Sequence, residues 1–189
     1  MPLFEAYREF VDEVVCVDWA QSLHRNEFLD YECDLNKPLP FGDCEFDTII
    51  LSDVLEHISA PHDLWREMSR LLKPGGKVLL NVPFYYWLHE EPHDYYRYTQ
   101  HALRLFAKTS GFEVLRLEAI GGAPEVVADI LAKNCVQLGA LGRTAAVALQ
   151  YLCLRLVRSR KGTTLSRRTS AKFPLGYFLI AEKRYATFL

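Results

Sequence analysis

Eleven consecutive residues, His89 to Thr99, concentrate the side chains in this chain that could do chemistry. They include His89, His93, Asp94 and Arg97, and they follow an apolar run. A histidine with an ordinary pKa of about 6.5 can accept a proton near neutral pH, a carboxylate can orient it, and a guanidinium can hold an anion. The sequence therefore predicts these four residues as catalytic candidates, with His89 and His93 as the stronger two.

The same segment has a structural alternative. Asp94 and Arg97 are spaced to pair with each other and hold the loop, and Thr99 is placed to cap a helix that begins near Gln100. We expect Thr99 to be such a cap. Both interpretations of Asp94 and Arg97 stand at this point.

The elements that must position these residues follow an alternating pattern. Apolar runs rich in β-branched residues predict strands at 14–18, 46–52, 77–83, 112–119 and 177–181. Helical spacing predicts helices over 3–11, 53–72 and 100–110. This alternation indicates an α/β fold with a mostly parallel sheet covered by helices on both faces, in which ligands bind beyond the carboxyl ends of the strands.

Length and composition set further bounds. The 189 residues suit one domain, predicted over 1–189, with a helical and basic insertion over 123–172 before the last strand. Five cysteines without C-x-x-C spacing argue against a disulfide framework and against a zinc site, and no metal is expected. No signal peptide or membrane-spanning run is recognised, so the expected location is the cytoplasm.

Several short motifs follow one another through the first half of the chain. They are D-L-x-x-P-L-P-F-x-D-x-x-F-D from Asp34, L-E-H at 55–57 and L-L-K-P-G-G at 71–76. The series resembles the middle of the class I S-adenosylmethionine-dependent methyltransferases of type 11, over about 14–122 and again in the last strand. The segment from His89 to Thr99, H-x-x-P-x-D-Y-x-R-Y-T, is similar to a signature of a subset of these enzymes, several of them associated with glycan and envelope-biosynthesis loci.

The resemblance implies a Rossmann-like fold and S-adenosyl-L-methionine as the cofactor. It also implies roles for individual residues: a ribose-binding acid, an aromatic ring against the adenine, an acid with its neighbour near the adenine amino group, and a loop beside the methionine part. The His of the L-E-H element is expected to brace that loop rather than to transfer a proton. In the order of the chain, the implied cofactor-binding residues are Asp18, Trp19, Asp34, Leu35, Ser52, Asp53 and His57.

The chain departs from the family pattern before Asp18. Family members have another strand there and a glycine-rich G-x-G-x-G loop, whereas the first glycine of this chain is Gly42. The first strand of the sheet is therefore predicted to be missing or truncated. Either roughly 30–50 upstream residues are absent, the length of one strand-loop-helix unit, or the chain is a degenerate relative.

The insertion carries the strongest charge asymmetry in the chain. Residues 143–158 are apolar on nearly every side, which predicts a helix buried in protein, in a dimer interface or in a lipid interface. Seven Lys or Arg and no acid lie between Arg155 and Lys172, and such cations attract anionic lipid at about 1 kcal/mol each. The alternative, slightly favoured here, is a solvated loop beside a helical pair that caps the substrate.

These observations predict methyl transfer to a small-molecule or lipid- or glycan-linked acceptor, directed to an oxygen. The alternative is a catalytically inactive methyltransferase-like module that binds a protein partner or a membrane surface. Nucleic acid is not expected as a partner, because the basic residues are not interleaved with aromatic ones. Peripheral membrane contact through 143–172 and a homodimer are the expected modes of association.

Overall fold

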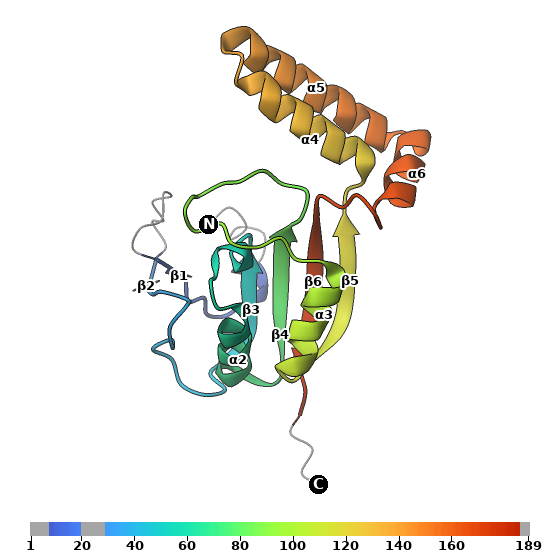
Figure 1. The fold of residues 1–189 in the computed structure, drawn as a ribbon. Helices are drawn as coiled ribbons and strands as arrows, with labels where there is room; N and C mark the ends of the chain where they lie inside the picture. Colours follow the sequence, from blue (N-terminus) through green and yellow to red (C-terminus); the bar gives the residue numbers. More distant parts are fainter. Residues whose placement is uncertain (1–7, 20–28, 186–189) are drawn as a thin grey trace.

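The computed structural model describes residues 8–19 and 29–185 (Figure 1). Its main body is a four-stranded sheet in the order β3-β4-β6-β5, built from β3 (Phe46–Ser52), β4 (Leu72–Pro83), β6 (Gly176–Lys183) and β5 (Phe112–Ile120). β3 pairs in parallel with β4, and β6 runs antiparallel to β4 and β5. Three strands thus share one direction and β6 opposes them, which confirms the predicted Rossmann-like α/β fold.

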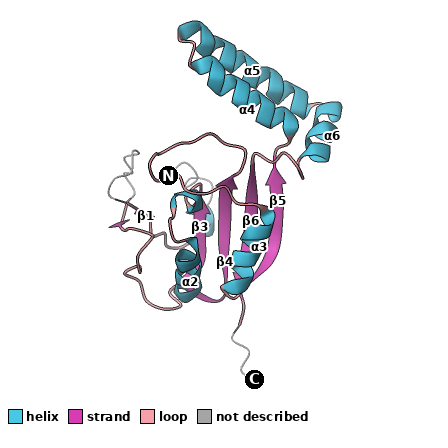
Figure 2. Ribbon diagram, in the orientation of Figure 1, coloured by secondary structure: helices cyan, strands magenta, loops and turns pink. Residues whose placement is uncertain are grey.

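Helices α2 (Pro61–Leu71) and α3 (Gln100–Thr109) lie on the same face of this sheet (Figure 2). The core forms beneath them, where the fully buried Trp65 meets Phe112 edge to face at 5.4 Å. Successive side chains of a strand point to opposite faces. Leu51 therefore faces this core, while its neighbour Ile50 faces the other side and is 42% exposed. Helices were predicted on both faces of the sheet, and in the described chain α2 and α3 cover one of them.

The N-terminal strands stand apart from the main sheet. β1 (Val17–Asp18) and β2 (Tyr31–Glu32) pair in parallel with each other and form a sheet of their own. β3 is an edge strand, and no other strand in the described residues pairs with its outer side. In the described chain, the outer backbone groups of β3 therefore have no strand to pair with.

The helix predicted over 53–72 is wrong in its first third. The structure has a short 3-10 turn, η2 (Leu55–His57), and α2 begins only at Pro61. Proline suits the first helical position, since it has no N–H to donate, and it disfavours helical geometry in the residue before it. The Asn36 side chain accepts hydrogen bonds from the amides of Ser59 and Ala60, which holds the chain open there.

Two other boundary predictions have different outcomes. Of the helix predicted over 3–11, the structure describes one 3-10 turn, η1 (Arg8–Phe10), and residues 3–7 lie outside the described chain. The cap predicted at Thr99 is confirmed, because its hydroxyl accepts a hydrogen bond from the Ala102 amide at the start of α3.

The P-L-P-F segment is held against α2 by one arginine. Arg70 donates hydrogen bonds to the carbonyls of Leu39 and Phe41 and pairs with Glu67 at 2.6 Å. Glu67 in turn accepts a hydrogen bond from the Leu39 amide. The loop that leads into β3 therefore has a fixed path.

Three helices lie between β5 and β6 in the chain. They are α4 (Ala123–Val136), α5 (Ala140–Arg158) and α6 (Arg160–Thr169), within the region predicted as a helical insertion. Figure 1 shows α4 and α5 side by side, extending away from the sheet beyond the carboxyl end of β5. α6 packs at the base of this pair.

Candidate active site

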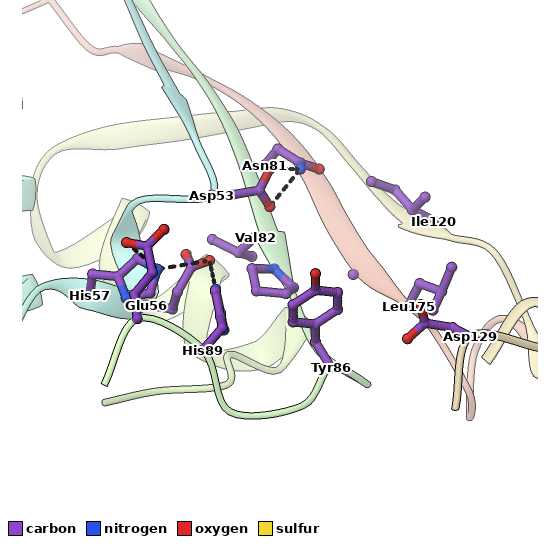
Figure 3. A pocket seen from close by; sticks show the side chains of 13 residues that line it. Asp53, Glu56, His57, Asn81, Val82, Tyr86, His89, Ile120, Asp129 and Leu175 are labelled. Carbon is purple, nitrogen blue, oxygen red and sulfur yellow. Dashed lines mark hydrogen bonds and ion pairs between the residues drawn. The ribbon is translucent and has the colours of Figure 1, made fainter. Parts of the chain in front are cut away.

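A cavity of about 390 Å³ opens at the carboxyl ends of β3 and β4 (Figure 3). Its walls come from the turn after β3, the end of β4, the loop after β4 and the start of the helical insertion. The volume lies within the usual range of ligand sites. Its ionisable lining residues are Asp53, Glu56, His57, His89, Glu90 and Asp129, with Tyr86 beside them.

Asp53 is fixed at the point where β3 ends. Its backbone is in the left-handed region, with φ of 53°, and its amide donates a hydrogen bond to the Asn81 carbonyl. The Asn81 side-chain amide donates to both carboxylate oxygens, at 3.0 and 3.1 Å. The Ser52 hydroxyl donates to the same carboxylate. Asp53 therefore presents a negative charge at a defined place in the pocket wall.

Glu56 is the buried acid of this site. Its side chain is fully buried, and neither carboxyl oxygen has a hydrogen-bond partner in the described chain. Burial, helped by the charges of Asp53 and Asp94, raises the pKa of Glu56 to about 8, while its own backbone N–H and the charge of Arg97 act in the opposite direction. A carboxyl group with this pKa exchanges its proton near neutral pH.

Two imidazoles face Glu56. The Nε2 atoms of His57 and His89 each lie 3.8 Å from its Oε1. His57 Nδ1 is 2.9 Å from the His93 carbonyl, and a carbonyl can only accept, so Nδ1 carries the hydrogen. His89 Nδ1 hydrogen-bonds with the Trp87 carbonyl at 3.3 Å and lies 3.2 Å from an Asp94 oxygen, and both acceptors favour the same tautomer. Both Nε2 atoms thus lie near one buried carboxyl group, at distances longer than a hydrogen bond.

Asp94, held by Arg97, contacts both the amide and the ring of His89. Asp94 is almost fully buried and accepts two hydrogen bonds from the guanidinium as well as one from the His89 amide. The Arg97 contact lowers the pKa of Asp94 to about 2. Arg97 also donates to the carbonyls of Tyr86, Trp87 and Tyr96. These contacts favour the loop-holding interpretation of Arg97 over an anion clamp, and they make Asp94 the residue that orients His89.

His93 lies outside the cavity lining. Its Nδ1 is 3.0 Å from the Tyr95 hydroxyl, and its ring meets Trp19 edge to face at 4.8 Å. Its backbone carbonyl receives the His57 contact described above. Of the two predicted histidines, the structure brings His89 to Glu56 and gives His93 a place between Trp19 and the loop.

The remaining predicted cofactor residues do not line the cavity. Asp18 ends β1 and accepts a hydrogen bond from the Trp19 amide at 2.8 Å. Asp34 accepts two hydrogen bonds from Asn36 and pairs with Lys37, so it closes a turn. Leu35 packs against the hydrophobic core.

Glu56 and Asn81 are the site residues that sequence reasoning missed. Glu56 was visible only as the middle letter of the L-E-H motif, and Asn81 as a polar residue inside the apolar strand KVLLNVP. A polar side chain within a buried strand is a signal that could have pointed to Asn81. The ligand atoms of Glu56, His57 and His89 all lie within 4.8 Å of one another, a spacing that would also admit a metal ion.

The stability of the protein should depend on Glu56 in a defined direction. The unfolded chain ionises this carboxyl near pH 4.5, whereas the folded chain keeps its proton until about pH 8. The folded state therefore binds more protons in this interval, and stability falls as the pH rises through it. We expect Glu56→Gln to remove this decline, as measured by urea unfolding between about pH 5 and about pH 8.

Glu118→Gln is the control for this measurement. Glu118 is an exposed acid paired with Arg116, and that contact lowers its pKa, so its charge does not change over the same interval. Its variant should keep the slope of the native protein. Equal slopes for the native protein and Glu56→Gln would contradict the assignment of a buried, protonated Glu56.

Part of the chain is similar in sequence to known methyltransferases. Residues 3–80 match the family described as "Methyltransferase domain". An uncharacterized methyltransferase of Mycobacterium leprae is 44% identical over 50 residues, covering 26% of this chain and 18% of that protein. The demethylmenaquinone methyltransferase of Renibacterium salmoninarum is 30% identical over 81 residues, covering 40% of this chain and 34% of that protein. The chain thus spans well under half the length of these curated relatives.

Solved structures agree on the fold. An S-adenosylmethionine-dependent methyltransferase from Archaeoglobus fulgidus superposes with a TM-score of 0.61 at 16% identity, covering 96% of this chain and 80% of that one. The [4+2]-cyclase SpnF superposes with a TM-score of 0.50 at 20% identity, covering 84% and 57%. These likenesses show the fold, and a fold of this kind can carry different chemistries.

Proposed function

We propose that the chain is a class I S-adenosylmethionine-dependent methyltransferase that transfers a methyl group to a hydroxyl oxygen of its acceptor. The observation that carries the oxygen preference is the buried carboxyl of Glu56 facing the Nε2 atoms of His57 and His89. A hydroxyl must lose a proton as it is methylated, so a proton acceptor at the pocket is useful. A module without catalytic activity has no need for such a group.

The donor chemistry of the pocket fits one end of the cofactor. The fixed carboxylate of Asp53, with Ser52 beside it, suits the ammonium group at the amino-acid end of S-adenosylmethionine. Asp18 and Trp19 would hold the ribose and the adenine, and Asp34 with Leu35 would lie near the adenine amino group. The cofactor supplies an electrophilic methyl group on sulfur.

The residues of the chain then have distinct tasks. The walls of the cavity align the acceptor oxygen with the methyl group, which is the main contribution a protein can make to an in-line displacement. As the acceptor oxygen takes up the methyl group, His89 Nε2 would accept the hydroxyl proton. The Asp94 carboxylate, 3.2 Å from Nδ1 of His89, would stabilise the imidazolium that forms.

The position of the cavity supports a choice of acceptor class. Ile120 and Asp129 line it from the end of β5 and from α4, so one wall belongs to the helical insertion. An acceptor that enters there contacts the exposed aromatic loop of Tyr86 and Trp87. We propose a small-molecule or lipid- or glycan-linked alcohol as the acceptor.

Binding of S-adenosylhomocysteine, measured by isothermal titration calorimetry, tests the proposal without knowledge of the acceptor. We expect saturable binding that Asp53→Asn weakens by about tenfold or more, since the lost charge-assisted contact is worth about 1.5–3 kcal/mol. Asp47→Asn is the matched control, because Asp47 is an exposed acid of the same strand that pairs with Lys73. Absence of binding, or equal weakening by both variants, would overturn the proposal.

A further inference from the structure

The helical insertion packs through small residues and leaves its large ones outside. On α5 the buried residues are Gly142 and Ala146, and on α4 they include Ala128 and Ala132. A Cβ added at Gly142 would lie 1.9 Å from the Cys135 carbonyl oxygen, so the two helices are in backbone contact there. Close packing through small side chains turns the larger apolar side chains of α5 toward solvent.

The exposed surface of the insertion is strongly apolar. On α5, Leu141 is 87% exposed, Val147 68% and Leu152 62%. Only 11% of the most apolar 18-residue window of this 19-residue helix is buried. The neighbouring surface adds further exposed apolar side chains: Val127, Ile130, Leu131, Leu138, Tyr151 and Leu154. So many exposed large apolar side chains on one pair of helices indicate an interaction site.

The charges on this surface have one sign. Residues 139–172 contain eight Lys or Arg and no acid. The two acids of α4 are occupied internally, because Asp129 pairs with Lys133 at 2.6 Å and Glu125 accepts a hydrogen bond from the Ser166 hydroxyl. The outer surface of these helices therefore carries leucine and arginine side chains without neighbouring carboxylates. A partner that matches it has an apolar interior and a negatively charged surface.

We infer that α5 and α6 dock on the surface of an anionic phospholipid bilayer, with α5 lying in the interface. An interfacial helix buries its apolar side chains at the acyl boundary while long arginines extend to the head groups. Lying flat suits α5 better than crossing, since Arg143, Arg155 and Arg158 lie along it and α4 is paired with it. Arg160, Lys161, Arg167 and Arg168 continue the cationic surface on α6.

Other occupants fit this surface less well. A second copy in a symmetric dimer would bring eight cations against eight cations. A nucleic acid would meet the phosphate-binding arginines but would find leucine and valine where bases stack on aromatic rings. Both remain as outcomes of the experiment.

The cavity opens beside the same surface. Lys133 of α4 lies 3.3 Å from the centre of the Tyr86 ring and 5.3 Å from that of Trp87. Trp87 and Leu88 are exposed on this loop, at 47% and 69%. Aromatic rings of this kind favour the membrane interface. If the proposed function holds, an acceptor carried by a lipid would reach the cavity from the bilayer.

Vesicle flotation with the full chain tests the inference. The probes are vesicles of phosphatidylcholine alone and vesicles of phosphatidylcholine with phosphatidylglycerol. We expect the protein to float with the anionic vesicles and less with the neutral ones. Replacing Arg155, Arg158, Arg167 and Arg168 by glutamine should weaken binding roughly fivefold for each arginine removed. Leu141→Ser with Leu152→Ser should weaken binding to both kinds of vesicle.

The control removes four cations from the body of the protein instead: Lys37, Lys73, Lys77 and Arg116, each replaced by glutamine. It changes the net charge equally and should float like the native protein. No flotation of the native protein, or equal flotation of the two glutamine variants, would overturn the inference. Two further results would also overturn it. One is a native dimer in sedimentation that Leu152→Ser dissociates, because the apolar surface would then be a dimer interface. The other is binding of polyuridine without binding of vesicles. Asp53→Asn should float normally, which separates this result from the proposed function.

Discussion

Replacing His89 by alanine should lower the rate of methyl transfer by a factor of about 10²–10⁴, the usual contribution of a positioned proton acceptor. The variant loses the imidazole whose Nδ1 is held by Asp94 and whose Nε2 faces Glu56. Cofactor binding should change little, since Asp53 and Asn81 keep their contacts. The measurement is incorporation of tritiated methyl groups into a membrane extract of the source cells, at saturating S-adenosylmethionine.

His93→Ala is the matched control for this prediction. His93 is a neighbouring histidine of the same loop that does not line the cavity, so its loss should have a much smaller effect. Asp94→Asn should behave like His89→Ala, because an amide can present its N–H to Nδ1 and favour the wrong tautomer. Equal activity of His89→Ala and His93→Ala would remove His89 from the reaction. Loss of activity in a chelator, restored by zinc, would assign Glu56, His57 and His89 to a metal instead.

Replacing Trp65 by alanine should reduce the free energy of unfolding by about 3–5 kcal/mol, the usual cost of deleting a large core side chain. Trp65 is fully buried between α2 and the sheet and packs against Phe112. Removal of the indole leaves a cavity that can close only if α2 or the strands shift. Urea unfolding followed by far-ultraviolet circular dichroism measures the change.

Trp87→Ala provides the comparison. Trp87 is 47% exposed, on the loop after β4, and its removal should shift the unfolding free energy far less. Trp65→Phe should be milder than Trp65→Ala, because it keeps most of the volume and removes an indole N–H that has no hydrogen-bond partner in the described residues. Similar losses for Trp65→Ala and Trp87→Ala would contradict the core described above.

Much of the fold could be predicted from local patterns. The predicted strand 46–52 has the same bounds as β3. The predicted strands 112–119 and 177–181 end or begin one or two residues short of β5 and β6. A run of β-branched residues bounded by turn residues carries enough information for this. The start of α2 could not be read in the same way, since the apolar spacing continues through Val54 and Ile58 while Pro61 and Asn36 decide where the helix begins.

The site was predictable in part. The motif spacing pointed to His89 and Asp94, which the structure brings together, and to Asp53 and His57, which line the same cavity. Glu56 was not predicted, because its importance comes from burial and from the two imidazoles that surround it, and both are tertiary properties. The sequence could not show that His93 turns toward Trp19 while His89 turns toward Glu56, since the two residues are only four positions apart.

The open side of β3 has a practical consequence for work with this chain. Within the described residues, no strand pairs with the outer amides and carbonyls of Phe46–Ser52, and such an edge, in a segment of high β-propensity, is a template on which another extended chain can add. Concentrated samples should therefore self-associate by strand addition, and a short peptide that matches this edge would compete with this process. Protein concentration then becomes an experimental variable in its own right, to be held constant whenever two variants are compared.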